Sequence, residues 1–148
     1  MDYTEAKIGR IFILRLHQNE CLHEVIEAFA VKKQIKNAMC FFLGGVADKS
    51  KVVVGPEDGK IMPPNPMITL LQGVHEGCGL GTIFVDETDT PKLHMHASFG
   101  RKNNAVAGCV RMGVNIWLIG EVVILEMTGG SAKRVKNKET GFELLETQ

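Results

Sequence analysis

The feature that most limits the fold of this chain is a succession of short apolar segments, of which only one repeats like a helix. In that segment Leu22, Val25, Ile26, Phe29 and Ala30 recur at the spacing of one helical face. The other segments are rich in β-branched and aromatic residues and are separated by turn-forming residues. They predict strands near residues 9–17, 38–43, 51–54, 67–74, 80–85, 92–99, 105–110 and 117–127.

These eight candidate segments, some of them very short, indicate a sheet of about seven strands. About seven strands and one main helix are typical of an α+β domain built on a mostly antiparallel sheet. Asn19 is expected to cap the helix. Proline and glycine mark residues 56–66 as a loop, and the glycine-rich stretch 77–81 is expected to form a turn between two strands. Because the 148 residues contain no internal repeat and no linker, we expect one domain over residues 1–148.

Composition narrows the class of protein. With 45% hydrophobic and 23% charged residues, the chain has the make-up of an ordinary globular protein. Its longest apolar runs, 116–119 and 122–125, are far shorter than the roughly 20 residues of a transmembrane helix. The first residues lack the features of a signal peptide, so we expect a cytosolic protein without a membrane partner. Seventeen basic and 17 acidic residues leave no net charge, which argues against direct nucleic-acid binding without excluding it.

Two histidines one residue apart are the sharpest chemical feature. In a strand, His94, His96 and Ser98 lie on one face and Leu93, Met95, Ala97 and Phe99 on the other. The two imidazoles, about 6.6 Å apart at Cα, can converge on one divalent cation. The alternative is that both are hydrogen-bonded, half-exposed polar side chains, since two histidines alone do not complete a zinc site.

Cys109 is the best candidate for a third ligand. A turn at residues 100–104 would form a hairpin and place Cys109 opposite His94 or His96. None of the four cysteines forms a C-x-x-C motif, which excludes a zinc ribbon or a thioredoxin motif and leaves free thiols or metal ligands. The alternative for Cys109 is a small buried thiol without a ligand role.

Two further groups of polar residues are candidates for a functional role. Glu121 interrupts an apolar strand and would need a partner if it were buried. It could pair with Arg111, orient a metal-bound histidine, or lie at a subunit interface. A basic stretch could contact phosphates, although nearby glutamates favour a solvated surface instead. Its residues are Lys133, Arg134, Lys136 and Lys138.

Taken in order, the motifs resemble those of the PPC domain, also written PCC, of plants and prokaryotes. The resemblance covers nearly the whole chain, and the His-x-His motif with the glycine-bearing and glutamate-bearing strands after it is its most specific part. The matching segments are Gly9-Arg10, the helix at 20–31, Gly44-Gly45-Val46, Leu71-Gln72-Gly73, Leu93-His94-Met95-His96, Ala107-Gly108-Cys109, Gly120-Glu121-Val122-Val123 and Thr140-Gly141-Phe142.

The resemblance implies a compact α+β fold and a homotrimer whose subunits adjoin through the sheet. Plant members carry AT-hooks that bind A·T-rich DNA, and stand-alone prokaryotic members are described as candidate DNA-binding proteins. This chain has no Arg-Gly-Arg-Pro hook. It also has Ala107-Gly108-Cys109 where many prokaryotic relatives have Gly-Gly-His, so Cys109 either preserves a metal site with His94 and His96 or marks its loss.

Three functions follow from these observations. The first is a trimeric, non-enzymatic PPC-like module that acts with DNA or a DNA-associated protein. The second is a small zinc-dependent enzyme or metal-bound ligand sensor, since three protein ligands leave an open position for water or a small ligand. The third is an interaction scaffold whose histidines are structural. No residue stands out as a catalytic acid, base or nucleophile.

Overall fold

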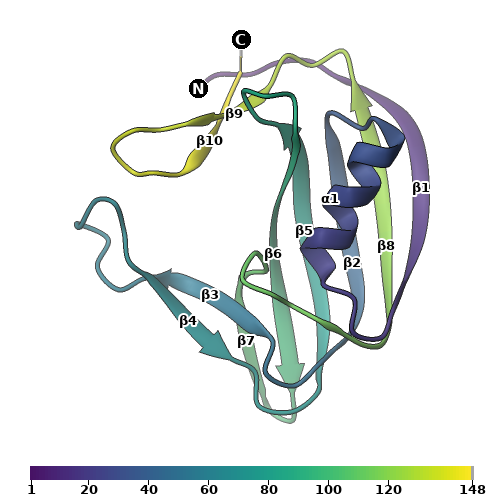
Figure 1. Cartoon of the computed structure of the whole chain (residues 1–148), viewed down its shortest axis with the longest axis vertical. Coiled ribbons are helices and arrows are strands. Elements are labelled where there is room, and N and C mark those ends of the chain that lie inside the picture. Colours follow the sequence, from purple (N-terminus) through teal and green to yellow (C-terminus); the bar gives the residue numbers. More distant parts are fainter. Residues whose placement is uncertain (148) are drawn as a thin grey trace.

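The computed structural model describes residues 1–147 and contains one large sheet, one helix and a separate hairpin (Figure 1). The sheet has eight strands in the order β1-β8-β2-β5-β6-β7-β3-β4, and β9 pairs with β10. The elements are β1 (Lys7–His17), α1 (Leu22–Lys33), β2 (Ala38–Val46), β3 (Lys51–Pro56), β4 (Pro66–Leu70), β5 (His75–Val85), β6 (Pro91–Arg101), β7 (Asn104–Cys109), β8 (Ile116–Thr128), β9 (Lys133–Lys136) and β10 (Glu143–Glu146).

Neighbouring strands of the sheet run antiparallel in all the pairings of residues 1–147, which confirms the predicted fold class. The sequence pattern missed two elements. Part of the short β9–β10 hairpin was identified only as a basic stretch, because four-residue strands carry little periodic signal.

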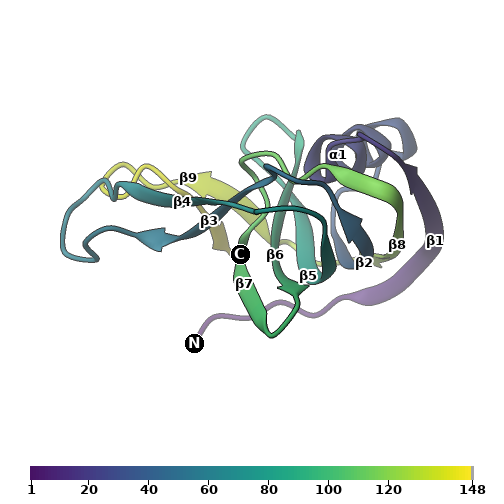
Figure 2. The ribbon, with the colours of Figure 1, turned by 90° about the horizontal axis from the view of Figure 1, so that it is seen from below.

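One face of the sheet is covered by α1, and the core lies between them (Figure 2). The helix buries Leu22, Ile26 and Ala30, which belong to the predicted apolar face. On the sheet, the large side chains of Phe42, Met95 and Phe99 face the same core. The other buried members include Leu16, Cys40, Ile83, Leu93, Ile116, Val122 and Ile124.

The start of the helix differs from the prediction. Its N-cap is Cys21, whose side chain makes no capping hydrogen bond, whereas Asn19 has a φ of 69°. The backbone N–H of Asn19 donates to the carbonyl of Ile116, and that of Leu22 donates to Val114. Hydrogen bonds to the first residue of β8 and to the segment just before it therefore fix the start of the helix, in place of the expected side-chain cap.

The strand β1 is less buried than its apolar composition suggests. Phe12, Leu14 and Leu16 pack toward the core, but Ile11 and Ile13 on the opposite side are 60% and 84% exposed. As an edge strand, β1 has the helix on only one face. The sheet therefore has a bare, partly apolar second face.

Residues 77–81 are strand, not turn, and lie in the middle of β5. Their glycines face the core and leave room for large neighbours. A Cβ at Gly81 would lie 2.7 Å from the Cβ of Met95, and one at Gly77 would lie 3.0 Å from the ring of Phe42. The glycines thus reflect close packing between strands, which the sequence alone does not distinguish from a turn.

No helix in residues 1–147 is long and apolar enough to cross a membrane.

Candidate functional site

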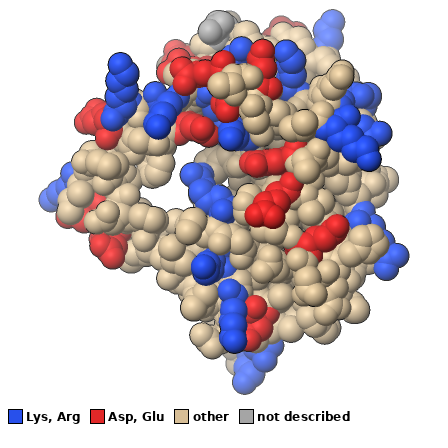
Figure 3. Space-filling view, in the orientation of Figure 1, with Lys and Arg blue, Asp and Glu red and all other residues tan. Residues whose placement is uncertain are grey.

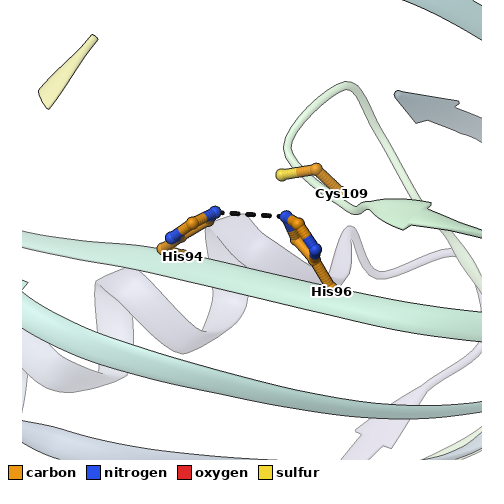
Figure 4. Close-up of side chains that lie close together, drawn as sticks. All are labelled: His94, His96 and Cys109. Atoms are coloured by element: carbon orange, nitrogen blue, oxygen red, sulfur yellow. Dashed lines mark hydrogen bonds between the residues drawn. The ribbon is translucent and has the colours of Figure 1, made fainter. Parts of the chain in front are cut away.

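The His-x-His motif lies on the face of β6 that points away from the helix. Leu93, Met95, Ala97 and Phe99 are buried in the core, and the intervening histidines are exposed, as the strand alternation predicts. The Nε2 atoms of His94 and His96 are 3.2 Å apart, with the two rings nearly perpendicular (Figure 4).

Cys109 joins this pair from the neighbouring strand. In the β6–β7 hairpin, Cys109 pairs directly with His96. The turn is tighter than expected, since Arg101 pairs with Asn104, and this sets the register. The Cys109 Sγ points toward the imidazoles (Figure 4), and one nitrogen of each histidine and the sulfur all lie within 4.8 Å of one another.

Gly108 allows β3 to cross close to the end of β7. A side chain at this position would collide with the backbone oxygen of Val53. Val53 pairs with Cys109 in the single bridge between β3 and β7. The close crossing holds the cysteine, which is 7% exposed, against the rest of the site.

The surroundings of His94 favour its neutral form. Burial against the cavity walls lowers the pKa of His94 to about 4, and the positive charges of Arg134 and Arg111 and the neighbouring His96 add to this effect. Its ring is still partly open to solvent. A neutral imidazole is the form that coordinates a metal.

The three side chains line a cavity of about 1330 Å³. Two hairpins project on either side of it (Figure 1), and the space-filling view shows the opening between them (Figure 3). The sheet forms its floor, where Phe41 and Leu80 lie in the same row of paired residues as His96 and Cys109. Two hairpins form its walls. They contribute Val53, Val54, Pro64 and Pro66 from the β3–β4 hairpin and Phe142, Leu144 and Leu145 from the β9–β10 hairpin.

Arg134 is part of this cavity, which the sequence did not indicate. It is only 6% exposed, its Nη2 donates to the Thr82 Oγ1 at 3.1 Å, and its guanidinium lies 5.8 Å from the centre of the Phe84 ring. Thr82 pairs with His94 across β5 and β6. The β9–β10 hairpin thus brings Arg134, which is distant in the sequence, close to the histidine pair.

The rest of the basic stretch lies outside the cavity. Lys133 forms an ion pair with Asp89 at 3.2 Å, and the backbone N–H of Lys136 donates to Glu87. Lys136 and Lys138 are exposed. Acidic residues of the β5–β6 turn therefore offset part of the positive charge of this stretch.

Arg111 and Glu121 lie in different parts of the molecule. The Nε of Arg111 donates to the Cys109 Sγ at 3.0 Å, so Arg111 belongs to the site. Glu121 is exposed on β8, opposite Arg15, and the strands β2 and β5 separate it from β6. The structure therefore does not bring Glu121 to Arg111 or to the histidines, and an interface role is the alternative left for it.

A second group of metal-ligand side chains lies at the start of α1. The Cys21 Sγ is 3.3 Å from the Nδ1 of His23, and Glu24 lies nearby. Burial raises the pKa of the Cys21 thiol. The sequence did not indicate this group, because a helical wheel does not show that Cys21, the residue before the helix, turns back toward His23.

Comparison with solved structures finds the same fold in several prokaryotic proteins. A metal-containing protein from Archaeoglobus fulgidus is 23% identical, with 97% of this chain and 98% of that chain covered and a TM-score of 0.83. A plant- and prokaryote-conserved protein from Pyrococcus horikoshii is 22% identical, with 100% and 99% covered and a TM-score of 0.84. A putative DNA-binding protein from Bacteroides thetaiotaomicron is 19% identical, with 99% of both chains covered and a TM-score of 0.77.

A search of curated protein sequences found no match. The family model of the Plants and Prokaryotes Conserved domain matches residues 3–128, which include every strand of the large sheet, the helix and all three residues of the histidine–cysteine group. The chain therefore belongs to the Plants and Prokaryotes Conserved (PCC) domain family.

Proposed function

We propose that this chain is a metal-binding protein in which His94, His96 and Cys109 hold one zinc ion on the floor of a ligand-binding cavity. The observation that carries the proposal is the convergence of three donor atoms from two adjacent strands, with the two Nε2 atoms 3.2 Å apart. The Archaeoglobus protein of the same fold is named as metal-containing, which is consistent with this function.

The donor geometry fits zinc. Two imidazoles bound to tetrahedral zinc at about 2.0–2.1 Å have their nitrogens about 3.3 Å apart, close to the separation of His94 and His96. A thiolate at about 2.3 Å from the ion lies about 3.6 Å from each nitrogen. Since the three atoms are within 4.8 Å of one another, the Cys109 sulfur needs to move by only about 1 Å.

The site is suited to binding a ligand more than to stabilising the fold. Zinc with three protein ligands keeps a position for water or a small ligand and can act there as a Lewis acid. In this chain that side of the group faces the cavity. We assign no residue as a catalytic acid, base or nucleophile.

Elemental analysis of purified protein tests the proposal. We expect about one zinc per chain in the wild type and none in the His94→Ala/His96→Ala variant, with Cys109→Ser binding zinc more weakly. The control is His17→Ala, which removes an exposed histidine far from the group and should keep its zinc. A wild type without stoichiometric zinc, or a double variant with unchanged zinc, overturns the proposal.

A second proposal concerns the oligomer and DNA. We propose that the chain forms a homotrimer through the bare side of β1, β8 and β2, where Ile11, Ile13 and Leu43 are 60%, 84% and 61% exposed and Glu121 lies beside them. Apolar residues in such a group usually mark an interface. The trimer would work as a DNA-associated module, a function suggested by the name of the Bacteroides protein.

The mass of the protein in solution tests the trimer, and Ile13→Glu should reduce it to that of the 16.3 kDa chain. A monomeric wild type contradicts this proposal. For DNA, Lys136→Glu/Lys138→Glu should weaken binding to duplex DNA, and binding should fall as salt rises. Undetectable binding at low salt excludes direct phosphate contact and leaves the zinc proposal untouched.

A further inference from the structure

The environment of Arg134 points to the kind of ligand that the cavity takes. Arg134 is only 6% exposed, and a guanidinium in such a place needs acceptors for its five N–H groups. Thr82 accepts from Nη2, while Nε–H has no acceptor among residues 1–147. A buried cation with an unused donor beside a cavity is suited to an anionic ligand.

Arg111 adds a second positive charge to the same site. Its Nε donates to the Cys109 Sγ, and its charge, after the effect of burial, further lowers the pKa of Arg134. Glu143 on β10 is the acidic group that acts on Arg134 from the cavity wall. None of the ion pairs within 4.0 Å in the described part of the chain includes either arginine.

The positive charges of Arg134 and Arg111 repel a divalent cation that is bound by the neighbouring histidines. An anion placed between the arginines and the metal ligands would offset the repulsion. Binding of the anion and binding of zinc should therefore favour each other, and by thermodynamic linkage each should raise the affinity for the other by the same factor.

The remaining lining of the cavity defines the rest of the ligand. Phe41 and Leu80 form the floor beside His96, and Phe142 and Leu144 contribute to a wall. Such surfaces favour an apolar body, so an inorganic anion would leave them unused. Arginine binds a carboxylate in a planar, two-bond arrangement, and Glu143 would repel a second negative charge.

We propose that the cavity binds a small organic carboxylate, with the carboxylate group held by Arg134 and Arg111 next to His94 and the apolar part resting on Phe41 and Leu80. This inference rests on the zinc-binding function proposed above and specifies the class of its ligand.

Octanoate is a suitable probe, and its binding can be measured by titration calorimetry on the zinc-loaded and the zinc-free full chain. We expect octanoate to bind the wild type, to bind at least about tenfold more weakly to Arg134→Gln, and to be displaced little by octylamine. Octanoate should also raise the zinc affinity of the wild type. The matched control is Lys133→Gln, which changes the adjacent surface cation paired with Asp89 and should leave octanoate binding unchanged.

Because Arg134 is buried, its loss could disturb folding, and Arg111→Gln provides a second measurement on an exposed side chain. Equal octanoate affinity in the wild type, Arg134→Gln and Arg111→Gln overturns the proposal, as does tighter binding of octylamine or octyl phosphate than of octanoate. Zinc content is measured separately. A wild type without zinc that still binds octanoate through Arg134 contradicts the zinc proposal and supports the carboxylate site.

Discussion

The two faces of β6 show how one strand separates folding from binding. Met95 and Phe99 point into the core under α1 and are 1% and 0% exposed. His94 and His96 alternate with them and point into the cavity. Since neighbouring residues of a strand lie on opposite faces, substitutions only one residue apart should affect different properties, either the free energy of unfolding or the binding of metal and ligand.

The largest expected effect is on the core face. Phe99→Ala removes a fully buried ring and should lower the free energy of unfolding by about 3–5 kcal/mol, measured by urea denaturation of the metal-free protein. The folded fraction should keep its zinc. His96→Ala, on the cavity face, should change the stability of the metal-free protein much less. If both variants lost the same free energy of unfolding, the core face and the cavity face of β6 would not have separate roles in folding and binding.

A smaller effect is expected where β5 packs against the core face of β6. Gly81→Ala would place a Cβ 2.7 Å from that of Met95 and 2.9 Å from the backbone oxygen of His94, so one strand must shift. We expect a loss of about 1–3 kcal/mol in urea denaturation. Gly59→Ala is the control, because a Cβ there meets nothing within 4 Å. A Gly81→Ala variant as stable as the control would contradict the close packing of β5 and β6.

Some features of β6 and its surroundings could be predicted from the sequence, and others could not. Alternation in one strand predicted the two faces of β6, and a short hairpin predicted the approach of Cys109, because both depend on local geometry. The role of Arg134 depends on the position of β9 over β5, which no local pattern contains. The core-facing glycines of β5 were misread as a turn, since glycine serves both in turns and where strands with large side chains approach closely.

The exposure of one face of β1 could not be predicted from the sequence for a similar reason. Ile11 and Ile13 alternate with Phe12 and Leu14, so both sides of the strand are apolar and the sequence predicts burial of both. The structure has a helix for only one side. An apolar pattern shows that a surface avoids water, but it does not show whether the same chain or another copy covers it.

The smallest expected effect concerns the pH dependence of the cavity face. Burial, Arg134, Arg111 and His96 lower the pKa of His94 to about 4 in the folded protein, whereas an unfolded histidine titrates near 6.5. Between these pH values the unfolded chain binds more protons, so the metal-free protein should become less stable as the pH falls from 6.5 to 4.

His94→Gln removes this contribution, so its stability should fall less over the same range, measured by urea denaturation at several pH values. The difference should be no more than about 1 kcal/mol, because solvent reaches part of the ring and screens the two arginines. Arg134→Gln should also reduce the pH dependence, since it takes away one of the charges that oppose protonation of His94. Equal pH dependence in the wild type and His94→Gln would mean that the arginines do not act on the imidazole. The electrostatic link between the metal ligands and the proposed carboxylate site would then be lost, even if both sites bind.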